Sequence, residues 1–372
     1  MSIARLLFSE SSPNLGGQEL QLLLQMSTLQ QRGIEVRLAC RPHSCIAAKA
    51  AELGLQTIAT PFRMSLQPRS ILILRRHLRA WRPDAVISHS GHDANNCAVA
   101  LRLLPRRPPL IRMRTYLPGP PHAWTYNLLA DRTLVCSQAL RQALLADGRI
   151  QPERIGVLTP GLALDVLAAD ATAPLPAHVD AWLERHPGPL LIHAAMLRPE
   201  KGHALLISAL PELLKRHPTL RYLIAGDGEQ RESLAAAIQA NKLSAHVFLA
   251  GMISPLAPLY RRATLAVMPS SYEPFGLAQC EALSLGTPVV ASRVGGIPET
   301  VQHEQTGLLV APGERLAWVA ALNRALEHPA EMRRMAEAGR DFVCRELSID
   351  ANVDHLLAEV SALLAARRAG RP

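Results

Sequence analysis

The sequence predicts an α/β protein built from two doubly wound domains, each with a parallel sheet covered by helices. Short segments rich in Val, Ile and Leu alternate with longer segments of helical apolar spacing along most of the 372 residues. The alternation stops once, at residues 159–176, which are rich in Gly, Pro, Ala and Asp, and then starts again. One hydrophobic core rarely grows beyond about 250–300 residues, so the length also favours two domains.

Apolar segments in the first half predict the strands of the first sheet, at residues 4–9, 35–40, 56–60, 85–89, 110–114, 133–136 and 155–158. Helices are expected between them at residues 18–32, 70–81, 93–104 and 137–147. A helix that connects two consecutive strands returns the chain to the same edge of the sheet, so we expect parallel strands. We assign residues 1–170 to this domain.

The second half repeats the pattern, with strands expected at residues 190–194, 221–225, 246–249, 264–268, 289–292 and 308–310. Helical spacing occupies residues 203–216, 229–241, 275–285 and 314–327, and continues from residue 329 almost to the end of the chain. We assign residues 171–345 to the second domain and residues 346–372 to a terminal helix.

Charge is distributed unevenly between the two halves. The net charge is +9; residues 1–170 carry 20 Lys and Arg against 11 Asp and Glu, whereas residues 171–372 carry 20 against 20. An acidic partner and an Arg-rich solvated surface both explain this excess, and charge alone does not decide between them. Nucleic acid is the least favoured partner, because the chain has only four Trp, five Tyr and five Phe and no stacking motif.

One helical segment of the first half combines basic and apolar side chains. Its arginines recur at helical spacing beside apolar residues: Arg75, Arg76, Arg79 and Arg82 beside Ile71, Leu72, Leu74 and Leu78. Such a helix either rests on an anionic membrane surface or buries its apolar face in the core and leaves the arginines in water. Both interpretations stay open at this point.

The cysteines and the apolar segments are typical of a cytoplasmic protein. Six scattered cysteines form no Cys-x-x-Cys pair and have no histidine at zinc spacing, so we expect reduced thiols and no metal. No apolar run approaches the roughly 18 residues of a membrane span, and the first residues resemble a strand more than a signal peptide. Binding of lipid by the basic helix would place the protein at the inner face of the cytoplasmic membrane.

The most informative segment is Glu273-Pro-Phe-Gly-Leu-Ala-Gln-Cys-Glu281, at the start of a predicted helix. Free N–H groups at a helix start attract anionic or hydroxyl-rich ligands, and carboxylates accept hydrogen bonds from sugar diols. Glu273 and Glu281 would therefore face one ligand at different depths. Taken alone, the segment is better explained by an acidic helix cap followed by a solvated glutamate.

Further polar or glycine-rich turns follow neighbouring strands of the second half. Arg198 and Lys201, before the next helix, have the charge to hold a diphosphate. The other turns are Gly226-Asp-Gly228, Gly251-Met252 and Gly295-Gly296-Ile-Pro-Glu299. Because the carboxyl ends of parallel strands share one edge of the sheet, these turns predict a single binding crevice.

In this order, the motifs of the second half resemble those of the retaining GT-B glycosyltransferases of family 4. They are Leu-Arg-x-x-Lys-Gly, Gly-x-Gly, Glu-Pro-Phe-Gly-Leu with a Glu-x7-Glu spacing, Gly-Thr-Pro-Val-Val-Ala-Ser and Gly-Gly-Ile-Pro-Glu. In the first half, Asn14-Leu-Gly16-Gly17 is similar to the family's Gly-Gly loop. The resemblance implies two facing Rossmann-like domains, the first on the acceptor side and the second binding a nucleotide sugar. It also implies that the terminal helix crosses back onto the first domain.

The resemblance further implies a role for each matching residue. Glu281 would bind the ribose, and Lys201 with Arg198 would neutralise the diphosphate leaving group. Glu273 and the backbone of the helix start would hold the transferred sugar. The donor-binding set is completed by Gly16, Gly17, Gly226, Met252, Phe275, Gly276 and Leu277. Transfer would retain the anomeric configuration and need no metal or other cofactor, because the nucleotide sugar is a co-substrate.

Two positions depart from the family pattern. Met196 stands where the family often has Arg, and Thr115 and Tyr116 follow the Arg-x-Arg of the fifth strand where a histidine is common. The acceptor-side group is therefore open, with Glu19, His89, His92, Asp93 and His122 as candidates.

We expect transfer of a sugar from a UDP-linked donor to a lipopolysaccharide or other cell-surface glycan precursor, so that a glycan or glycolipid is the second partner. A nucleotide-sugar epimerase or hydrolase on the same fold and a non-catalytic nucleotide-sugar binding protein are the alternatives.

Overall fold

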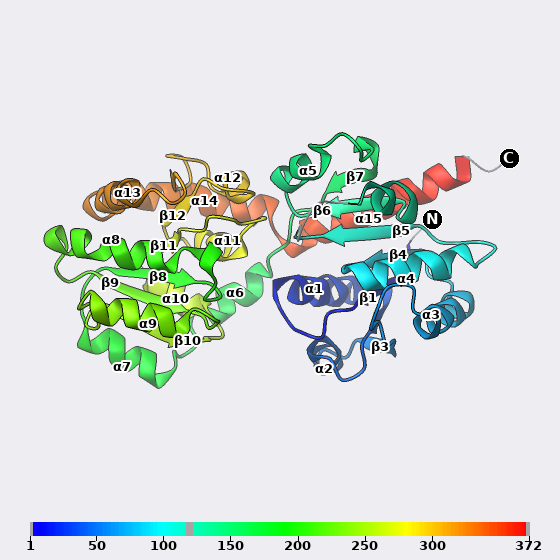
Figure 1. Ribbon diagram of the computed structural model, residues 1–372, viewed down its shortest axis with the longest axis horizontal. Coiled ribbons are helices and arrows are strands. Elements are labelled where there is room, and N and C mark those ends of the chain that lie inside the picture. The colour runs from blue at the N-terminus through cyan, green and yellow to red at the C-terminus, as the bar shows by residue number, and fades with distance from the viewer. Residues whose placement is uncertain (1–2, 117–121, 370–372) are drawn as a thin grey trace. The chain divides into compact units, whose positions relative to one another are not determined.

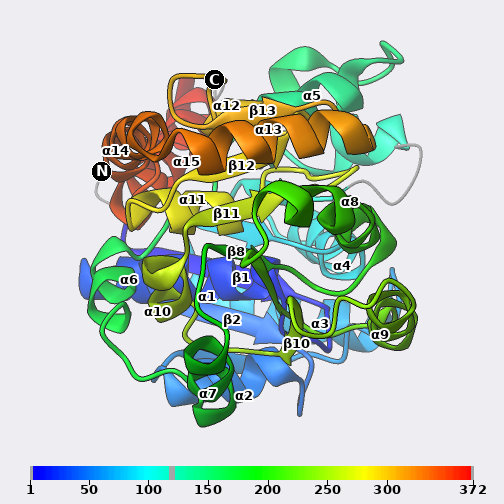
Figure 2. The same cartoon turned by 90° about the vertical axis from the view of Figure 1, so that its left-hand side faces the viewer.

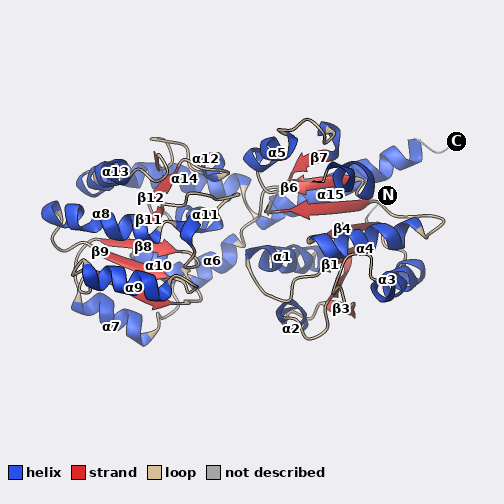
Figure 3. Ribbon diagram, in the orientation of Figure 1, coloured by secondary structure: helices blue, strands red, loops and turns tan. Residues whose placement is uncertain are grey.

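The computed structural model describes residues 3–116 and 122–369, which fall into two compact units (Figure 1). The first unit comprises residues 1–161 and 349–372, and the second comprises residues 162–348. Each contains a parallel sheet with helices on both faces (Figure 3), which confirms the predicted pair of Rossmann-like domains.

The sheet of the first unit has the strand order β3-β2-β1-β4-β5-β6-β7. Its strands are β1 (Arg5–Glu10), β2 (Glu35–Cys40), β3 (Gln56–Ala59), β4 (Ala85–Ser88), β5 (Leu110–Arg114), β6 (Arg132–Val135) and β7 (Ile155–Val157). Its helices are α1 (Gly17–Gln31), α2 (Cys45–Glu52), α3 (Pro68–Trp81), α4 (Gly91–Arg102), η1 (Thr125–Leu129), α5 (Gln138–Leu145), η2 (Pro152–Arg154) and α15 (Ile349–Ala369). The strand order reverses between β1 and β4, which pair in parallel from Leu6↔Ala85 to Ser9↔Ser88.

Apolar side chains cover both faces of this first sheet. On one face, α1, α2 and α15 share a core in which Met26, Ile46 and Val353 are buried. On the other face, α3 and α4 pack together over Val86, with Leu74, Leu78 and Leu101. The terminal helix α15 is therefore part of the first unit, because four of its apolar residues belong to this core: Ile349, Val353, Leu356 and Val360.

The sheet of the second unit has the strand order β10-β9-β8-β11-β12-β13 (Figure 2). Its strands are β8 (Leu190–Ala194), β9 (Arg221–Ala225), β10 (Val247–Gly251), β11 (Leu265–Met268), β12 (Val289–Ser292) and β13 (Leu308–Val310). The helices are α6 (Leu164–Asp170), α7 (Ala177–Arg185), η3 (Pro199–Lys201), α8 (His203–Arg216), α9 (Arg231–Ala240), α10 (Ala257–Arg262), α11 (Leu277–Ser284), α12 (Ile297–Thr300), α13 (Arg315–Glu327) and α14 (Pro329–Glu346). A core on one face joins α8, α9 and α13 around Trp318.

The boundary between the units lies in residues 159–176, where the alternation of strands and helices stops in the sequence. Residues 159–176 are not irregular throughout, because α6 forms within them and packs on α10 of the second unit. The chain leaves the first unit after Gly161 and returns to it at Ile349, and Leu347 and Ser348 separate α14 from α15. The Gly- and Pro-rich composition did not predict the short helix α6. The helix that it packs against, α10, lies about ninety residues further along the chain.

Candidate functional site

Lys201 and Glu273 form an ion pair at the carboxyl edge of the second sheet. Lys201 ends the η3 turn after β8, and Glu273 lies between β11 and α11, so the two residues follow neighbouring strands. Lys201 Nζ donates to Glu273 Oε2 over 2.6 Å, and the two side chains keep 20% and 10% of their surface exposed. Limited access of water strengthens this attraction relative to a surface pair.

The loop that carries Glu273 is bound to the loops on both sides through the backbone. Ser271 N donates to Glu200 O over 2.8 Å, and Gly296 N donates to Glu273 O over 3.1 Å. Gly295 has φ +50°, and a Cβ there would lie 1.9 Å from Glu273 O. A side chain at position 295 would therefore push the Glu273 backbone away from its present position.

A side chain at Gly226 would clash with the neighbouring loop. A Cβ at this position would lie 1.9 Å from Ala195 O, the carbonyl that follows β8. The family resemblance implies that Gly226 belongs to the donor-binding set. The structure shows that the space at Gly226 is occupied by backbone, so this glycine acts on the site by letting two strand-end loops approach.

Glu281 lies one turn inside α11, which begins at Leu277 with Gly276 as its N-cap residue. Phe275, just before the cap, is buried. Glu281 is half-buried, and its Oε2 accepts a 3.5 Å hydrogen bond from the Tyr260 hydroxyl. Burial raises the pKa of the Glu281 carboxyl to about 7, because the charged form loses water while this long hydrogen bond stabilises it only slightly.

Arg198 and Met252 are exposed residues of the expected donor site in the second unit. Arg198 is exposed, and its guanidinium has no hydrogen-bond partner among the described residues. Met252 follows β10 and is 69% exposed. Both lie after strands whose carboxyl ends reach the edge that carries Lys201.

Sequence inspection missed a buried aromatic stack beside Lys201. His193, on β8, stacks on His203, the first residue of α8, with ring centroids 4.1 Å apart, and His193 Nδ1 lies 2.7 Å from the Tyr222 hydroxyl. Burial, together with the Lys201 charge, lowers the pKa of His203 to about 4. Burial and the neighbouring His203 lower the pKa of His193 well below its ordinary value. Both rings are therefore neutral at physiological pH and add no charge beneath Lys201. The signal available in the sequence was a histidine inside an apolar strand.

In the first unit, Gly16 and Gly17 lie at the start of α1, where Gly16 is the N-cap. Glu19 is buried, and its Oε2 accepts a 2.8 Å hydrogen bond from Gly16 N. The carboxylate of this acceptor-side candidate thus closes the first turn of its own helix.

Asp93 and His89 lie at the point where the first sheet reverses its strand order. Asp93 is fully buried and accepts hydrogen bonds from the Ser9 and Ser11 hydroxyls and from the backbone N–H groups of His89 and Ser90. Burial and the nearby Glu10 raise the pKa of Asp93 to about 8. His89 is buried, and burial lowers its pKa to about 4.

Glu10 is a buried carboxylate that the sequence did not single out. Its Oε1 accepts from Ser12 N at 2.8 Å and from the Ser90 hydroxyl, and its Oε2 accepts from Gln18 Nε2 at 2.7 Å. Gln18 Oε1 in turn accepts from the Thr115 hydroxyl at 2.5 Å. This chain joins the ends of β1, β4 and β5 to the first turn of α1.

His92 and His122 are the exposed histidines among the candidates. His92 Nδ1 lies 3.0 Å from the Ser65 hydroxyl, and the His122 carbonyl accepts from the Thr125 hydroxyl at 2.8 Å. The structure brings His92 close to Asp93 and His89 at the end of β4, whereas His122 lies in the connection after β5.

Within residues 3–116 and 122–369, no group of three or more His, Cys, Asp or Glu side chains is placed to hold a metal ion. Over the same residues, no helix has the length and apolar content needed to cross a membrane.

Two family models match consecutive parts of the chain. The model described as Glycosyltransferase Family 4 matches residues 15–166, and the model described as Glycosyl transferases group 1 matches residues 177–342. The glycogen synthase of Mycobacterium tuberculosis is 32% identical over 275 residues, which cover 70% of this chain and 64% of that protein. The D-inositol 3-phosphate glycosyltransferase of Segniliparus rotundus is 31% identical over 63% of this chain and 53% of its own length. The alignments thus span less than two thirds of these relatives.

Solved structures share the fold over nearly the whole chain. A glycosyltransferase from Rickettsia africae ESF-5 superposes with a TM-score of 0.85 at 20% identity, covering 98% of this chain and 99% of that one. Anabaena Alr3699/HepE in complex with UDP-glucose superposes with a TM-score of 0.80 at 22% identity, covering 96% and 99%.

Proposed function

The chain belongs to the GT-B glycosyltransferases of the group 1 and family 4 type, and from this premise we propose that it transfers a sugar from a nucleoside diphosphate sugar to an acceptor hydroxyl. The observation that carries the proposal is the carboxyl edge of the second sheet. There a shielded Lys201–Glu273 pair lies beside the start of α11, which also carries Glu281. UDP is the proposed nucleotide, because a structural neighbour is described in complex with UDP-glucose.

In this proposal each group of the edge acts on one part of the donor. Glu281 accepts hydrogen bonds from the ribose hydroxyls, and Lys201 with Arg198 offsets the negative charge of the diphosphate. Glu273 holds the transferred sugar, together with the backbone around the start of α11, at Phe275, Gly276 and Leu277. Met252 and the loops shaped by Gly226 border the donor.

The proposed reaction breaks the bond between the anomeric carbon and the diphosphate oxygen. The acceptor oxygen bonds to the same face of that carbon, so the configuration is retained, and its proton passes to the departing diphosphate. Lys201 stabilises the negative charge that develops on the leaving group, the role that a metal ion fills in other enzymes. We therefore propose that the reaction proceeds without a metal.

The acceptor belongs to the first unit in this proposal, and a lipopolysaccharide or other cell-surface glycan precursor is its proposed class. Among the acceptor-side candidates, His92 and His122 keep exposed side chains, whereas the carboxylates of Glu19 and Asp93 already accept hydrogen bonds within the unit. His89 is buried against Phe8, with ring centroids 6.1 Å apart. The exposed histidines are thus the first positions to test for acceptor contact.

An anionic membrane surface at the cytoplasmic face is the proposed location of the acceptor. Residues 53–83 contain six arginines and neither Asp nor Glu, and α3 exposes Leu72 by 62% beside Arg75, Arg76 and Arg79. Basic and apolar groups on one helix suit a headgroup layer. Preferential sedimentation with anionic vesicles supports this location, and equal partition onto neutral vesicles contradicts it.

A thermal-shift panel of nucleotides and nucleotide sugars tests the proposed function, because a bound donor stabilises the folded state. We expect UDP and at least one UDP-sugar to raise Tm, and transfer to an acceptor to proceed in EDTA. Donor hydrolysis that is unchanged by any acceptor would point to a hydrolase. Binding without turnover would point to a binding protein, and loss of activity in EDTA restored by Mn²⁺ or Mg²⁺ would refute metal independence.

A further inference from the structure

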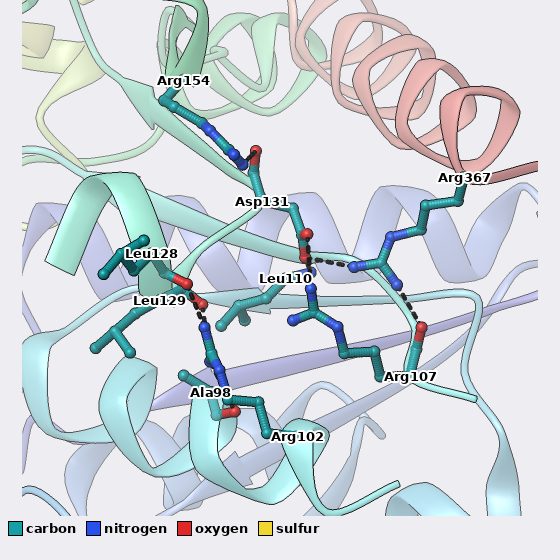
Figure 4. A network of polar contacts seen from close by, with 9 residues as sticks. All are labelled: Ala98, Arg102, Arg107, Leu110, Leu128, Leu129, Asp131, Arg154 and Arg367. Atoms are coloured by element: carbon teal, nitrogen blue, oxygen red, sulfur yellow. Dashed lines mark hydrogen bonds and ion pairs between the residues drawn. The ribbon is translucent and has the colours of Figure 1, made fainter. Parts of the chain in front are cut away.

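Four arginines from four separate segments lie in one network of polar contacts in the first unit (Figure 4), and two of them, Arg107 and Arg367, contact the same carboxylate. The carboxylate is Asp131, directly before β6. The arginines are Arg102 at the end of α4, Arg107 in the connection to β5, Arg154 in η2 and Arg367 in the last turn of α15. This cluster of four arginines and Asp131 therefore carries four positive charges and one negative charge, and the proposed transfer does not use it.

The two short contacts of the Asp131 carboxylate reach the same oxygen. Its Oδ2 accepts from Leu110 N at 2.8 Å and from Arg367 Nη2 at 2.7 Å. Arg107 Nη2 reaches Oδ1 only at 3.5 Å, the outer limit of a hydrogen bond. Asp131 therefore compensates Arg367 well and Arg107 poorly.

The remaining arginines are held by neutral acceptors. Arg102 donates to the carbonyls of Ala98, Leu128 and Leu129, and Arg154 Nη1 donates to the Asp131 carbonyl at 3.3 Å. Carbonyl groups orient a guanidinium but do not cancel its charge. Neither arginine forms an ion pair with another described residue. By contrast, Arg132 close by is neutralised by Glu359 through two contacts, at 3.1 and 3.2 Å.

Arg107 is the member of this cluster that is available to a ligand. Its side chain is 37% exposed, and its Nε and Nη1 donate to no described residue. Burial lowers the pKa of Arg107, the Asp131 charge raises it in part, and the charges of Arg367, Arg102 and Arg154 lower it. A cluster under this mutual repulsion gains from an added anion, and a guanidinium fork matches the oxygens of a phosphate group.

We infer that Arg107, with Arg102 and Arg367 beside it, binds a phosphate group at a site separate from the proposed donor site. The chemistry is that of a tetrahedral oxyanion, carried either by a soluble phosphate or by a phospholipid headgroup. Asp131 holds Arg367 and Arg107 in place and limits the affinity through its own negative charge. The inference stands independently of the proposed transfer reaction, because it uses no residue of the second unit.

Thermal unfolding of the full chain in sodium phosphate, compared with sodium chloride of equal ionic strength, tests the inference. We expect Tm to rise by about 2–4 °C in roughly 20 mM phosphate, as for a ligand near tenfold above its Kd. Arg107→Gln should abolish this rise. Arg63→Gln, which removes an exposed arginine of the same unit outside the cluster, should keep it.

Phosphate could also bind near Lys201, so Lys201→Ala separates the two sites. The inference predicts that Lys201→Ala keeps the phosphate-dependent rise, and its loss in that variant would overturn the inference. A full rise in Arg107→Gln would also overturn it. Asp131→Asn should enlarge the phosphate-dependent rise of Tm, because it removes the negative charge that opposes phosphate binding. If Asp131 only holds the arginines in place, this variant should be less stable and its phosphate-dependent rise should be unchanged.

Vesicles distinguish the two sources of the phosphate group. Phosphatidylglycerol–phosphatidylcholine vesicles should retain the wild type more strongly than Arg107→Gln if the ligand is a headgroup. Equal retention of the two proteins, together with a phosphate-dependent Tm rise that is lost in Arg107→Gln, identifies a soluble phosphate. Either result supports the site, and absence of both effects refutes it.

Discussion

Carboxylates lie at the carboxyl edges of both sheets, but those of the first unit accept more hydrogen bonds from the protein than those of the second. In the first unit, Asp93 receives four hydrogen bonds from Ser9, Ser11 and two backbone N–H groups, and Glu10 receives three. In the second unit, Glu281 receives one hydrogen bond of 3.5 Å, and Glu273 pairs with Lys201. The first set of carboxylates is engaged by the fold, and the second keeps most of its acceptor capacity.

This difference shows that residue type and position at a strand end are weak guides to function. A buried carboxylate whose acceptor sites are filled by its own unit stabilises loops and helix starts. A shielded carboxylate with few donors carries an electrostatic cost that a ligand relieves. By this criterion the second edge is the better candidate for binding, although both sheets offer a switch in strand order.

Replacement of Lys201 should produce the largest effect. Lys201→Ala removes the charge that offsets the diphosphate in the proposed reaction, and we expect kcat/KM to fall by about 10²–10³-fold. Steady-state kinetics with donor and acceptor measure this change. Lys215→Ala, which removes an exposed lysine on α8, is the matched control and should behave as wild type. A loss below about fivefold would place the leaving-group charge elsewhere.

The ion pair also changes what is expected of Glu273. If Glu273 contacts only the transferred sugar, Glu273→Ala should lower transfer and leave the affinity for free nucleotide nearly unchanged. Since Lys201 Nζ lies 2.6 Å from Glu273 Oε2, removal of Glu273 frees the ammonium, so the affinity for nucleoside diphosphate should rise. Calorimetry on the single and double variants tests this coupling, and it should vanish in a Lys201→Ala background.

The pH dependence of nucleotide affinity should sharpen the contrast at Glu281. Burial raises the pKa of this carboxyl to about 7, and the ionised form is the better acceptor for two ribose hydroxyls. Acidification therefore opposes binding, and we expect affinity for nucleoside diphosphate to fall about tenfold from pH 8 to pH 6. Glu281→Gln should show only the titration of the nucleotide itself. An identical pH profile for both proteins would contradict the ribose role.

Asp93 should affect stability, and its effect is the smallest of these four. Its pKa in the folded state, about 8, lies above the ordinary value of 3.8, so the folded protein binds an extra proton between these values. The unfolding free energy should therefore fall as pH rises, by about 1 kcal/mol between pH 7 and pH 8.5. Urea unfolding of wild type and Asp93→Asn measures this. The variant should lack that part of the pH dependence, and an equal slope would remove Asp93 as its source.

Local sequence patterns determined the architecture of this protein. The apolar segments predicted the strands of both sheets, because runs of β-branched and aliphatic residues specify buried strands through their immediate neighbours. The glycine and proline turns after those strands marked the edge where Lys201, Glu273 and Glu281 lie. The sequence pattern did not predict the short helix α6, because its local composition favours a loop and the helix that stabilises it, α10, is distant in the sequence.

The tertiary structure alone decided what each polar side chain touches. Lys201 and Glu273 are 72 residues apart in the chain, and Tyr260 and Glu281 are 21 apart. Nothing in the spacing of His193 and His203 announces a buried stack, and Arg107 and Arg367 reach Asp131 from positions 24 and 236 residues away. Contacts of this kind depend on how strands and helices pack in space, which sets burial, charge balance and hydrogen-bond capacity together. The sequence thus determined where polar groups gather, and only packing decided which of them the fold itself engages.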